Sequence, residues 1–252
     1  RGHVASLVRF SMHVGAAGFL WLAGWSNVFG QSLGASGVTV ALYAVAALSV
    51  VWMINLYNFM DGMDGLAGGM GVIGFTALAV FGWIDGDWAY MAMAGLIAST
   101  CLGFLIFNYP PARIFMGDAG STTLGFLAAA LGFLGVRDGL FPFWVPLLVF
   151  SPFVFDATWT LARRAAKGEK IWQAHRSHLY QRLVLAGWGR VRTLWLYYAL
   201  MFASALTCVA ARDWAFGNVV MLFTVWGLIY AFLAYFVAWV ERTGRPGNRF
   251  IL

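Results

Sequence analysis

Long apolar runs dominate the chain, and short polar segments separate them. Eight runs come close to the length of about 20 residues that an α-helix needs to cross a lipid bilayer. They cover roughly residues 8–26, 37–56, 66–84, 89–107, 120–136, 141–162, 193–211 and 217–240. The apolar residues are continuous rather than alternating, so the pattern predicts helices and excludes a membrane β-barrel. The expected fold is all-α, a polytopic transmembrane helical bundle of about eight helices in one integral-membrane domain over residues 1–252.

Composition supports lipid as the solvent. Hydrophobic residues make up 62% of the 252 positions and charged residues only 10%, whereas soluble domains carry about 25% charged residues. Helices satisfy their own backbone hydrogen bonds, which hydrocarbon requires. The two cysteines, Cys101 and Cys208, both fall within apolar runs. We expect them to be small buried side chains rather than a disulfide.

The basic residues are distributed by membrane side, which argues against a nucleic-acid partner for this chain of net charge +6. If the chain starts in the cytoplasm, 14 of the 16 Lys and Arg residues are cytoplasmic. The other two are Arg137 and Arg212. This asymmetry follows the positive-inside rule and predicts that both ends are cytoplasmic. The expected outer connections are 27–36, 85–88, 137–140 and 212–216.

Acidic residues in membrane proteins are costly and usually functional. Solvated loop charge is a sufficient explanation for those in the outer connections, namely Asp85, Asp87, Asp138 and Asp213. The remaining acids fall on or near the cytoplasmic side: Asp61, Asp64, Asp118, Asp156, Glu169 and Glu241. A transporter more often places such groups near the bilayer midplane. We therefore expect polar chemistry at one membrane face.

The first polar cluster lies in residues 55–69, with the sequence NLYNFMDGMDGLAGG. Its amide and acid side chains are spaced by three: Asn55, Asn58, Asp61 and Asp64. Neighbours at this spacing share a helix face, although a regular helix would rotate the series by about 60° per step. Gly62 and Gly65 allow the helix end to unwind, so we expect all four side chains to face one pocket. A helix cap with a turn is the alternative, but it needs only one such residue.

The second cluster lies in residues 107–125, with the sequence FNYPPARIFMGDAGSTTLG. Pro110 and Pro111 end the preceding run. The segment from Gly117 to Ser121 is typical of a helix start, where free backbone N–H groups favour anions. Asp118 there suits a hard cation that bridges phosphates. A simple N-cap remains the alternative interpretation of this aspartate.

The third cluster is HRSHLYQRL, residues 175–183, inside the predicted cytoplasmic loop 163–192. It contains His175, Arg176, His178 and Arg182. Zinc is not favoured, because no further Cys or His lies nearby. Binding of lipid headgroups is an alternative, above all for the basic residues Arg163, Arg164, Lys167 and Lys170. The alternation of His and Arg better suits a diphosphate or a sugar, which predicts a substrate-recognition loop.

With these three clusters in this order, the chain resembles the polyprenyl-phosphate N-acetylhexosamine-1-phosphate transferases, glycosyltransferase family 4. The resemblance implies an enzyme of the bacterial inner membrane with its active site on the cytoplasmic face. It would transfer HexNAc-1-phosphate from a UDP-N-acetylhexosamine to undecaprenyl phosphate and release UMP. The third cluster resembles the O-antigen-initiating branch, which implies UDP-GlcNAc or a UDP-FucNAc-like donor and a role in lipopolysaccharide synthesis. The alternative within the family is the peptidoglycan phospho-MurNAc-pentapeptide transferase, which carries adjacent histidines in this loop.

The resemblance also implies roles for particular residues. Asp118 would be the principal ligand of Mg²⁺ or Mn²⁺, with Asn58 close to the metal and the diphosphate. Asp61 and Asp64 would line the nucleotide side, as catalytic residues with Asp118 and Asn58. The substrate-binding residues would be Asn55, His175, Arg176, His178 and Arg182. Asp156 would orient Arg163 or a loop histidine.

One departure from the family concerns the start of the chain. Family members have about ten or eleven helices, with an aspartate pair in a cytoplasmic loop before the helix that here begins near residue 8. We expect this pair to lie just before Arg1, with about three helices further upstream, and the 252-residue piece alone to be inactive. Dimers occur in the family, so a homodimer is one expected assembly. A lipid-linked sugar transporter (flippase) and a non-catalytic membrane scaffold are rival hypotheses from other classes.

Overall fold

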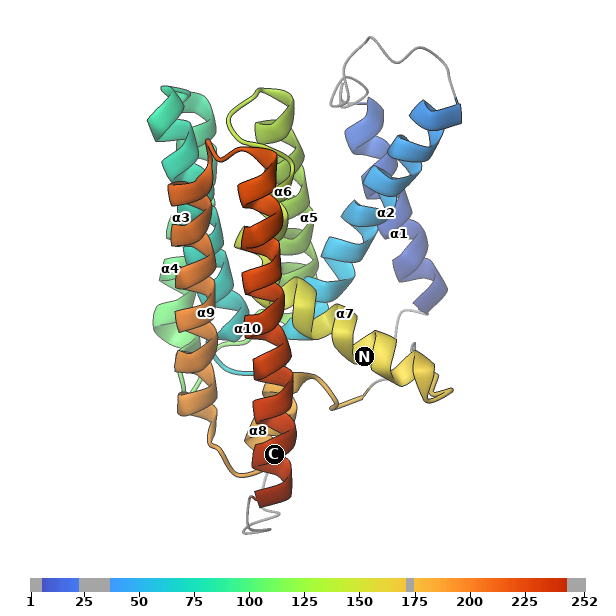
Figure 1. The fold of residues 1–252 in the computed structure, drawn as a ribbon, viewed down its shortest axis with the longest axis vertical. Helices are drawn as coiled ribbons and strands as arrows, with labels where there is room; N and C mark the ends of the chain where they lie inside the picture. The colour runs from blue at the N-terminus through green and yellow to red at the C-terminus, as the bar shows by residue number, and fades with distance from the viewer. Residues whose placement is uncertain (1–5, 23–36, 171–174, 244–252) are drawn as a thin grey trace.

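The computed structural model describes residues 6–22, 37–170 and 175–243 (Figure 1). Within these ranges the secondary structure is α-helical, without strands. The helices are α1 (Ser6–Leu22), α2 (Gly37–Met60), α3 (Leu66–Asp85), α4 (Trp88–Asn108), α5 (Gly117–Arg137), α6 (Trp144–Val149), α7 (Ser151–Ala166), α8 (Leu179–Leu185), α9 (Arg190–Ala211) and α10 (Phe216–Thr243). Arg1, Arg245, Arg249 and the predicted outer connection 27–36 lie outside the described residues.

Six of the described helices are long and apolar enough to cross a membrane, namely α2, α3, α4, α5, α9 and α10. Figure 1 shows α3, α4, α5, α9 and α10 standing side by side, with α1 and α2 forming a tilted pair beside them. The expected all-α polytopic bundle is therefore confirmed. The first predicted segment, 8–26, corresponds to α1, which has 17 residues in the described part of the chain.

The expectation of one continuous helix over 141–162 is wrong. The segment divides at Phe150 into the short helix α6 and the longer helix α7, which leaves the bundle obliquely (Figure 1). Pro152 lies in the first turn of α7, where its missing N–H is no loss, so this position favours a new helix start. The hydroxyl of Ser151 donates to the carbonyl of Leu148 at 2.6 Å. Pro152, four residues after Leu148, has no N–H to donate to this carbonyl in the usual helical way.

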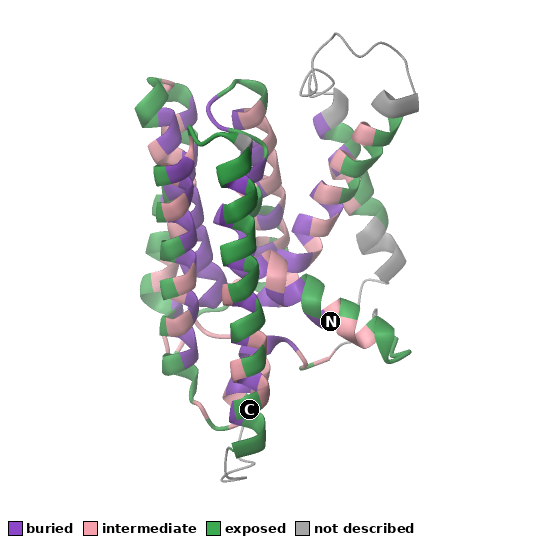
Figure 2. Cartoon of the chain, in the orientation of Figure 1, coloured by how far each residue is buried: buried purple, intermediate pink, exposed green. Residues whose placement is uncertain are grey.

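Burial follows the contacts between helices. Figure 2 shows buried residues on the faces that meet and exposed residues on the outward faces. The outward face of α10 carries large apolar side chains, including Leu228 and Phe232, each 67% exposed. Such a surface suits lipid rather than water. Cys101 and Cys208 are free and buried, as the sequence predicts.

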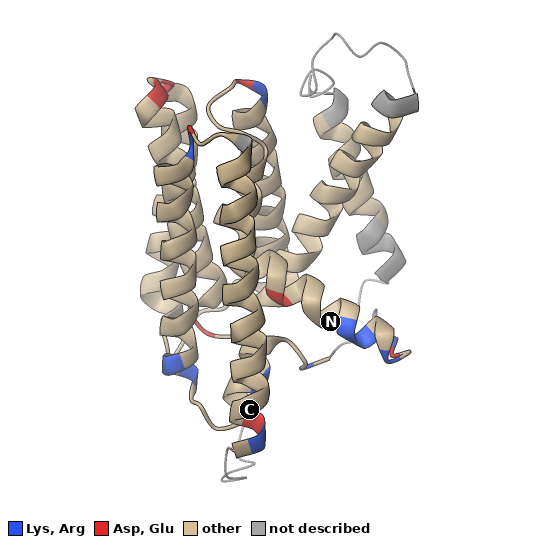
Figure 3. Cartoon of the chain, in the orientation of Figure 1, with Lys and Arg blue, Asp and Glu red and all other residues tan. Residues whose placement is uncertain are grey.

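Most charged residues lie toward the two ends of the described bundle (Figure 3). At the predicted outer end, Arg212 contacts Asp85 at 2.7 Å and joins the start of the α9–α10 connection to the end of α3. Arg137 pairs there with its neighbour Asp138 at 2.7 Å. Figure 3 shows basic residues of α7 and of the start of α9 toward the opposite end. The charged groups thus lie at opposite ends of the bundle, and the membrane orientation predicted from them stays a prediction.

Candidate functional site

The first and second motifs meet where α5 approaches α2. Gly125 allows this approach, because a Cβ there would lie 2.7 Å from the Met53 carbonyl oxygen. One turn earlier in α5, buried Ser121 accepts a hydrogen bond from the Asn58 side-chain amide at 2.9 Å. The same amide donates to Oδ1 of Asp118 at 3.2 Å. The structure therefore brings Asn58 and Asp118 together, and α5 begins at Gly117 as the sequence predicts.

Asp61 lies beside this pair, in the turn that follows α2. Burial, and then the negative charge of Asp118, raises the pKa of Asp61 to about 7. The two carboxylates therefore repel each other when both are ionised. A positive charge placed between them would relieve this repulsion, which makes the position suitable for a cation.

Asp64 and Asn108 tie the loops of the first two motifs together. Oδ2 of Asp64 accepts the Ala112 backbone N–H at 3.1 Å. The Asn108 side chain accepts the Gly65 N–H at 2.8 Å and donates to the Ile114 carbonyl at 2.9 Å. Sequence reasoning missed Asn108, and its position before the Tyr-Pro-Pro segment at the end of an apolar run was the available signal.

Asn55 departs from the expected common pocket. Its side-chain amide donates to the Val51 carbonyl at 2.7 Å and lies 3.2 Å from Nδ1 of His13 in α1. The helix α2 remains regular as far as Met60, and the chain unwinds only after it. Asn55 therefore faces α1 rather than Asp118, and the expectation of a single pocket for all four side chains is wrong for this residue. Its predicted substrate contact stays a prediction.

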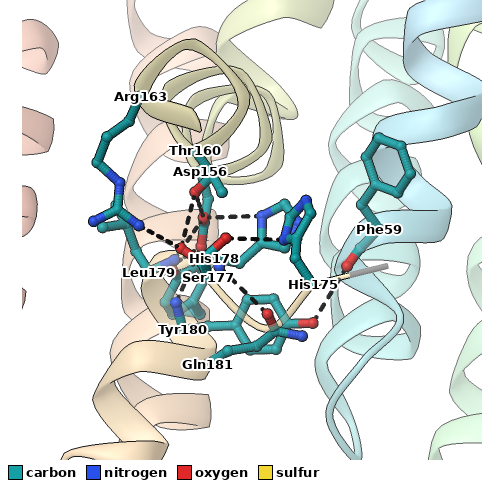
Figure 4. Close-up of polar contacts among 11 residues, drawn as sticks. Phe59, Asp156, Thr160, Arg163, His175, Ser177, His178, Leu179, Tyr180 and Gln181 are labelled. Atoms are coloured by element: carbon teal, nitrogen blue, oxygen red, sulfur yellow. Dashed lines mark hydrogen bonds and ion pairs between the residues drawn. The ribbon is translucent and has the colours of Figure 1, made fainter. Parts of the chain in front are cut away.

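The third motif is anchored by Asp156, which lies in α7 and has no exposed surface (Figure 4). The Asp156 carboxylate accepts the backbone N–H groups of Leu179 at 2.8 Å and Tyr180 at 3.1 Å, at the start of α8. Its Oδ1 also lies 3.3 Å from Nδ1 of His178. Asp156 thus contacts a loop histidine, which is one of the two roles that the sequence suggests for it.

The start of α8 packs against the end of α2. The Tyr180 hydroxyl donates to the Phe59 carbonyl at 3.2 Å, and the ring of His178 stacks on the Phe59 ring at 6.2 Å between centroids (Figure 4). Gly62 makes room, because a Cβ there would lie 2.1 Å from the Tyr180 hydroxyl oxygen. The third motif therefore lies against the first, and all three motifs share one region of the structure.

His175 and His178 lie side by side, with ring centroids 4.9 Å apart. Burial, and then the charges of His178 and Arg164, lowers the pKa of His175 to about 4. His175 is therefore neutral near pH 7. Its Nδ1 lies 3.0 Å from the Ser177 hydroxyl, which fixes the orientation of the ring.

The arginines of the loop region differ in their contacts. Arg163 donates to the Ser177 carbonyl at 3.1 Å instead of binding Asp156. Arg182 forms a bidentate ion pair with Glu241 of α10, with its Nε 2.7 Å from the carboxylate. Arg176 is exposed. The predicted substrate contacts of Arg176 and Arg182 stay predictions, and Arg182 would have to leave Glu241 to make one.

No group of three or more His, Cys, Asp and Glu side chains suited to a metal occurs among the described residues. Zinc sites usually use such groups. Mg²⁺ differs, because it usually takes one or two carboxylates together with substrate phosphates. Asp118, with Asn58 beside it, fits the second arrangement.

These observations define a multi-pass membrane protein with a polar site at one end of its helices. The sequence model of glycosyl transferase family 4 matches residues 2–136. The match covers more than half of the chain, and the chain belongs to this family.

Curated relatives agree with this assignment. The chain is 29% identical over 144 residues to a probable undecaprenyl-phosphate N-acetylglucosaminyl 1-phosphate transferase of Bacillus subtilis, covering 56% of this chain and 40% of the relative. It is 34% identical over 133 residues to the phospho-N-acetylmuramoyl-pentapeptide-transferase of Heliobacterium modesticaldum, covering 53% and 39%. The transferase of that name from Levilactobacillus brevis is 27% identical over 193 residues, covering 75% and 49%. The chain therefore spans less than half the length of these relatives.

Proposed function

We propose that the protein transfers a phospho-N-acetylhexosamine from its UDP donor to undecaprenyl phosphate and releases UMP. The reaction takes place at the cytoplasmic face of the bacterial inner membrane and begins the synthesis of O-antigen, lipopolysaccharide or a related envelope glycan. The observation that carries the proposal is the contact between Asn58 and Asp118, at 3.2 Å. Asp61 lies beside them and His178 packs on the adjacent Phe59.

The charges of the substrates explain why this site needs a cation. A UDP-sugar and a polyprenyl phosphate are both anions, so their approach requires neutralisation. Asp118 and Asn58 hold Mg²⁺ or Mn²⁺ in our proposal, and Asp61 faces the same position. When bound, the ion supplies positive charge to the diphosphate and to the departing UMP.

The loop after α7 supplies the remaining contacts. His175 presents a neutral imidazole, which donates or accepts a hydrogen bond to a sugar. The exposed guanidinium of Arg176 suits a diphosphate oxygen. His178 is buried against Phe59 and positions the loop over the nucleotide side of the site.

The transfer follows from this arrangement. A phosphate oxygen of undecaprenyl phosphate attacks the donor phosphorus that carries the sugar. The bond from that phosphorus to the bridging oxygen breaks, and UMP leaves with this oxygen. The acceptor phosphate is already largely ionised near neutral pH, so the attack requires no protein base. The task of the chain is therefore to position the two substrates and to balance their charge.

Two donors are compatible with the relatives. One relative is named for N-acetylglucosamine, and others are named for phospho-N-acetylmuramoyl-pentapeptide. We favour UDP-GlcNAc or a UDP-FucNAc-like donor, because this loop carries spaced histidines, His175 and His178. The pentapeptide donor is the second candidate.

To test this proposal, membranes that contain the whole protein are incubated with undecaprenyl phosphate, Mg²⁺ and one donor at a time. The donors are UDP-GlcNAc, UDP-FucNAc and UDP-MurNAc-pentapeptide. Release of UMP and formation of the lipid-linked sugar are measured together, with omission of acceptor as the control. We expect both products with an N-acetylhexosamine donor and not with the pentapeptide. A transporter or scaffold would release no UMP with any donor, and that result would end the proposal.

A further inference from the structure

Asp156 is a buried acid for which the sequence suggests only the orientation of Arg163 or a loop histidine. It is 0% exposed and lies in α7, outside the three motifs. A buried carboxylate is costly unless hydrogen bonds and charges compensate it. The identity of its partners therefore indicates what it stabilises.

The partners of Asp156 come from three separate parts of the chain. Oδ1 accepts the Leu179 N–H at 2.8 Å and the Thr160 hydroxyl at 3.2 Å. Oδ2 accepts the Tyr180 N–H at 3.1 Å and the hydroxyl of Tyr197 in α9. The first backbone N–H groups of a helix have no partner within that helix. One carboxylate thus fixes the start of α8 to α7 and α9.

The fixed segment is continuous with the recognition loop. His178 directly precedes Leu179, and its Nδ1 lies 3.3 Å from Oδ1 of Asp156. The Tyr180 side chain contacts α2 instead, where its hydroxyl donates to the Phe59 carbonyl at 3.2 Å. Phe59 follows Asn58 in the chain, so Asp156 sets the loop at a defined distance from the cluster around Asp118.

We propose that Asp156 is a positioning residue for the donor, an inference that rests on the proposed transferase function. Asp156 touches no substrate. It acts through His178 and the start of α8, which it holds so that His175 and Arg176 face a donor bound near Asp118. Small displacements of positioning groups reduce rates strongly, because the reacting atoms must lie within a narrow range of distances. In this proposal the polyprenyl acceptor binds outside the loop.

The test is Asp156→Asn in the whole protein. The amide replaces one accepting oxygen with a donating NH₂ group, which then faces an N–H or hydroxyl donor. We expect kcat/KM for the UDP donor to fall by about tenfold or more, which corresponds to about 1.4 kcal/mol. The KM for undecaprenyl phosphate should remain within about twofold, because the proposal places this acceptor outside the loop. A purely structural role would affect both substrates alike.

A second measurement does not depend on activity. Open membrane fragments are treated with trypsin, and cleavage after Arg176 is followed by mass spectrometry. We expect this cleavage to become about tenfold faster in Asp156→Asn, because the loop has lost its anchor. This result separates the two proposals: if no donor yields UMP in the wild type, the proposed function fails, while the trypsin rates still decide the role of Asp156.

Two milder variants serve if Asp156→Asn does not insert. Tyr197→Phe removes only the hydroxyl that donates a hydrogen bond to Asp156. We expect a smaller fall in kcat/KM for the donor and a smaller rise in the trypsin rate than for Asp156→Asn. Tyr90→Phe is the matched control, because it removes a buried hydroxyl that donates to the Leu131 carbonyl toward the other end of the bundle. Unchanged donor kinetics and trypsin rates in Tyr197→Phe, or equal effects on donor and acceptor, would overturn the inference.

Discussion

Gly125 of α5 lies against the backbone of Ile54 in α2, where a Cβ would come within 2.7 Å of the Ile54 Cα. The contact is between two main chains, so a flexible side chain cannot move aside to relieve it. One turn earlier in α5 and one turn later in α2, the same approach brings Ser121 to Asn58 at 2.9 Å. The geometry of the candidate site thus depends on a glycine that carries no chemistry of its own.

Gly125→Ala should separate the two helices and weaken the site. We expect a loss of about 1–3 kcal/mol in the free energy of unfolding, as for other overpacked positions. UMP release should fall by about tenfold or more, because Asn58 and Asp118 move apart. Gly103→Ala is the control, since a Cβ there meets nothing within 4 Å. Equal activity in the two variants would show that the close approach is unimportant.

Asp118→Asn should abolish transfer without affecting insertion. Asp118 lies exposed in the first turn of α5, so the isosteric change disturbs little packing. It removes the negative charge that holds the proposed cation, and we expect UMP release to fall by about 100-fold or more. Asp213→Asn, at the predicted outer end, is the matched control and should retain wild-type activity. Substantial UMP release by Asp118→Asn would contradict the metal role.

The pKa of Asp61 predicts a pH-dependent stability in the absence of divalent cations. It is raised from 3.8 to about 7, so the folded protein binds this proton more tightly than the unfolded chain. The stabilisation of the folded state by protonated Asp61 is complete below pH 3.8 and is lost as the pH rises through 7. Thermal unfolding of the wild type and Asp61→Asn should therefore be compared between pH 5 and 8. We expect the difference between the two midpoints to change with pH, and a constant difference would refute the shift.

Binding of Mg²⁺ should release a proton from the same group. A cation between Asp61 and Asp118 replaces repulsion with attraction, which lowers the pKa of Asp61. Addition of Mg²⁺ to weakly buffered protein at pH 7 should acidify the solution, as a pH indicator would record. The Asp61→Asn variant should give a clearly smaller signal, and an equal signal would place the released proton elsewhere.

His175 should act on stability in the opposite direction. Its pKa is lowered from 6.5 to about 4, so the unfolded chain binds the proton more tightly. The free energy of unfolding therefore decreases as the pH falls below 6.5, and this loss is complete below about pH 4. His175→Gln should flatten this part of the profile, measured by thermal unfolding from pH 7 to 4.5. An unchanged slope would mean that His175 titrates normally in the folded protein.

The sequence determined the helices and where several of them end. Runs of about 20 apolar residues predict membrane helices because lipid admits few other structures. Pro110 follows the end of α4, and the chain leaves α2 just before Gly62, as their backbone preferences require. The break at Phe150 was not predicted, because residues 141–162 remain apolar on both sides of it.

Only the tertiary structure decided which polar side chains meet. Asn58 and Asp118 are 60 residues apart, and Phe59 and Tyr180 are 121 apart, so their contacts depend on how whole helices pack. The three-residue spacing predicts that Asn55 and Asn58 face one pocket. In the structure, however, the Asn55 side chain points toward α1. Local propensities act over a few residues, and they specify helix ends and polar clusters. Contacts between distant segments instead depend on close approaches such as that of Gly125 and Ile54, which a linear pattern does not encode.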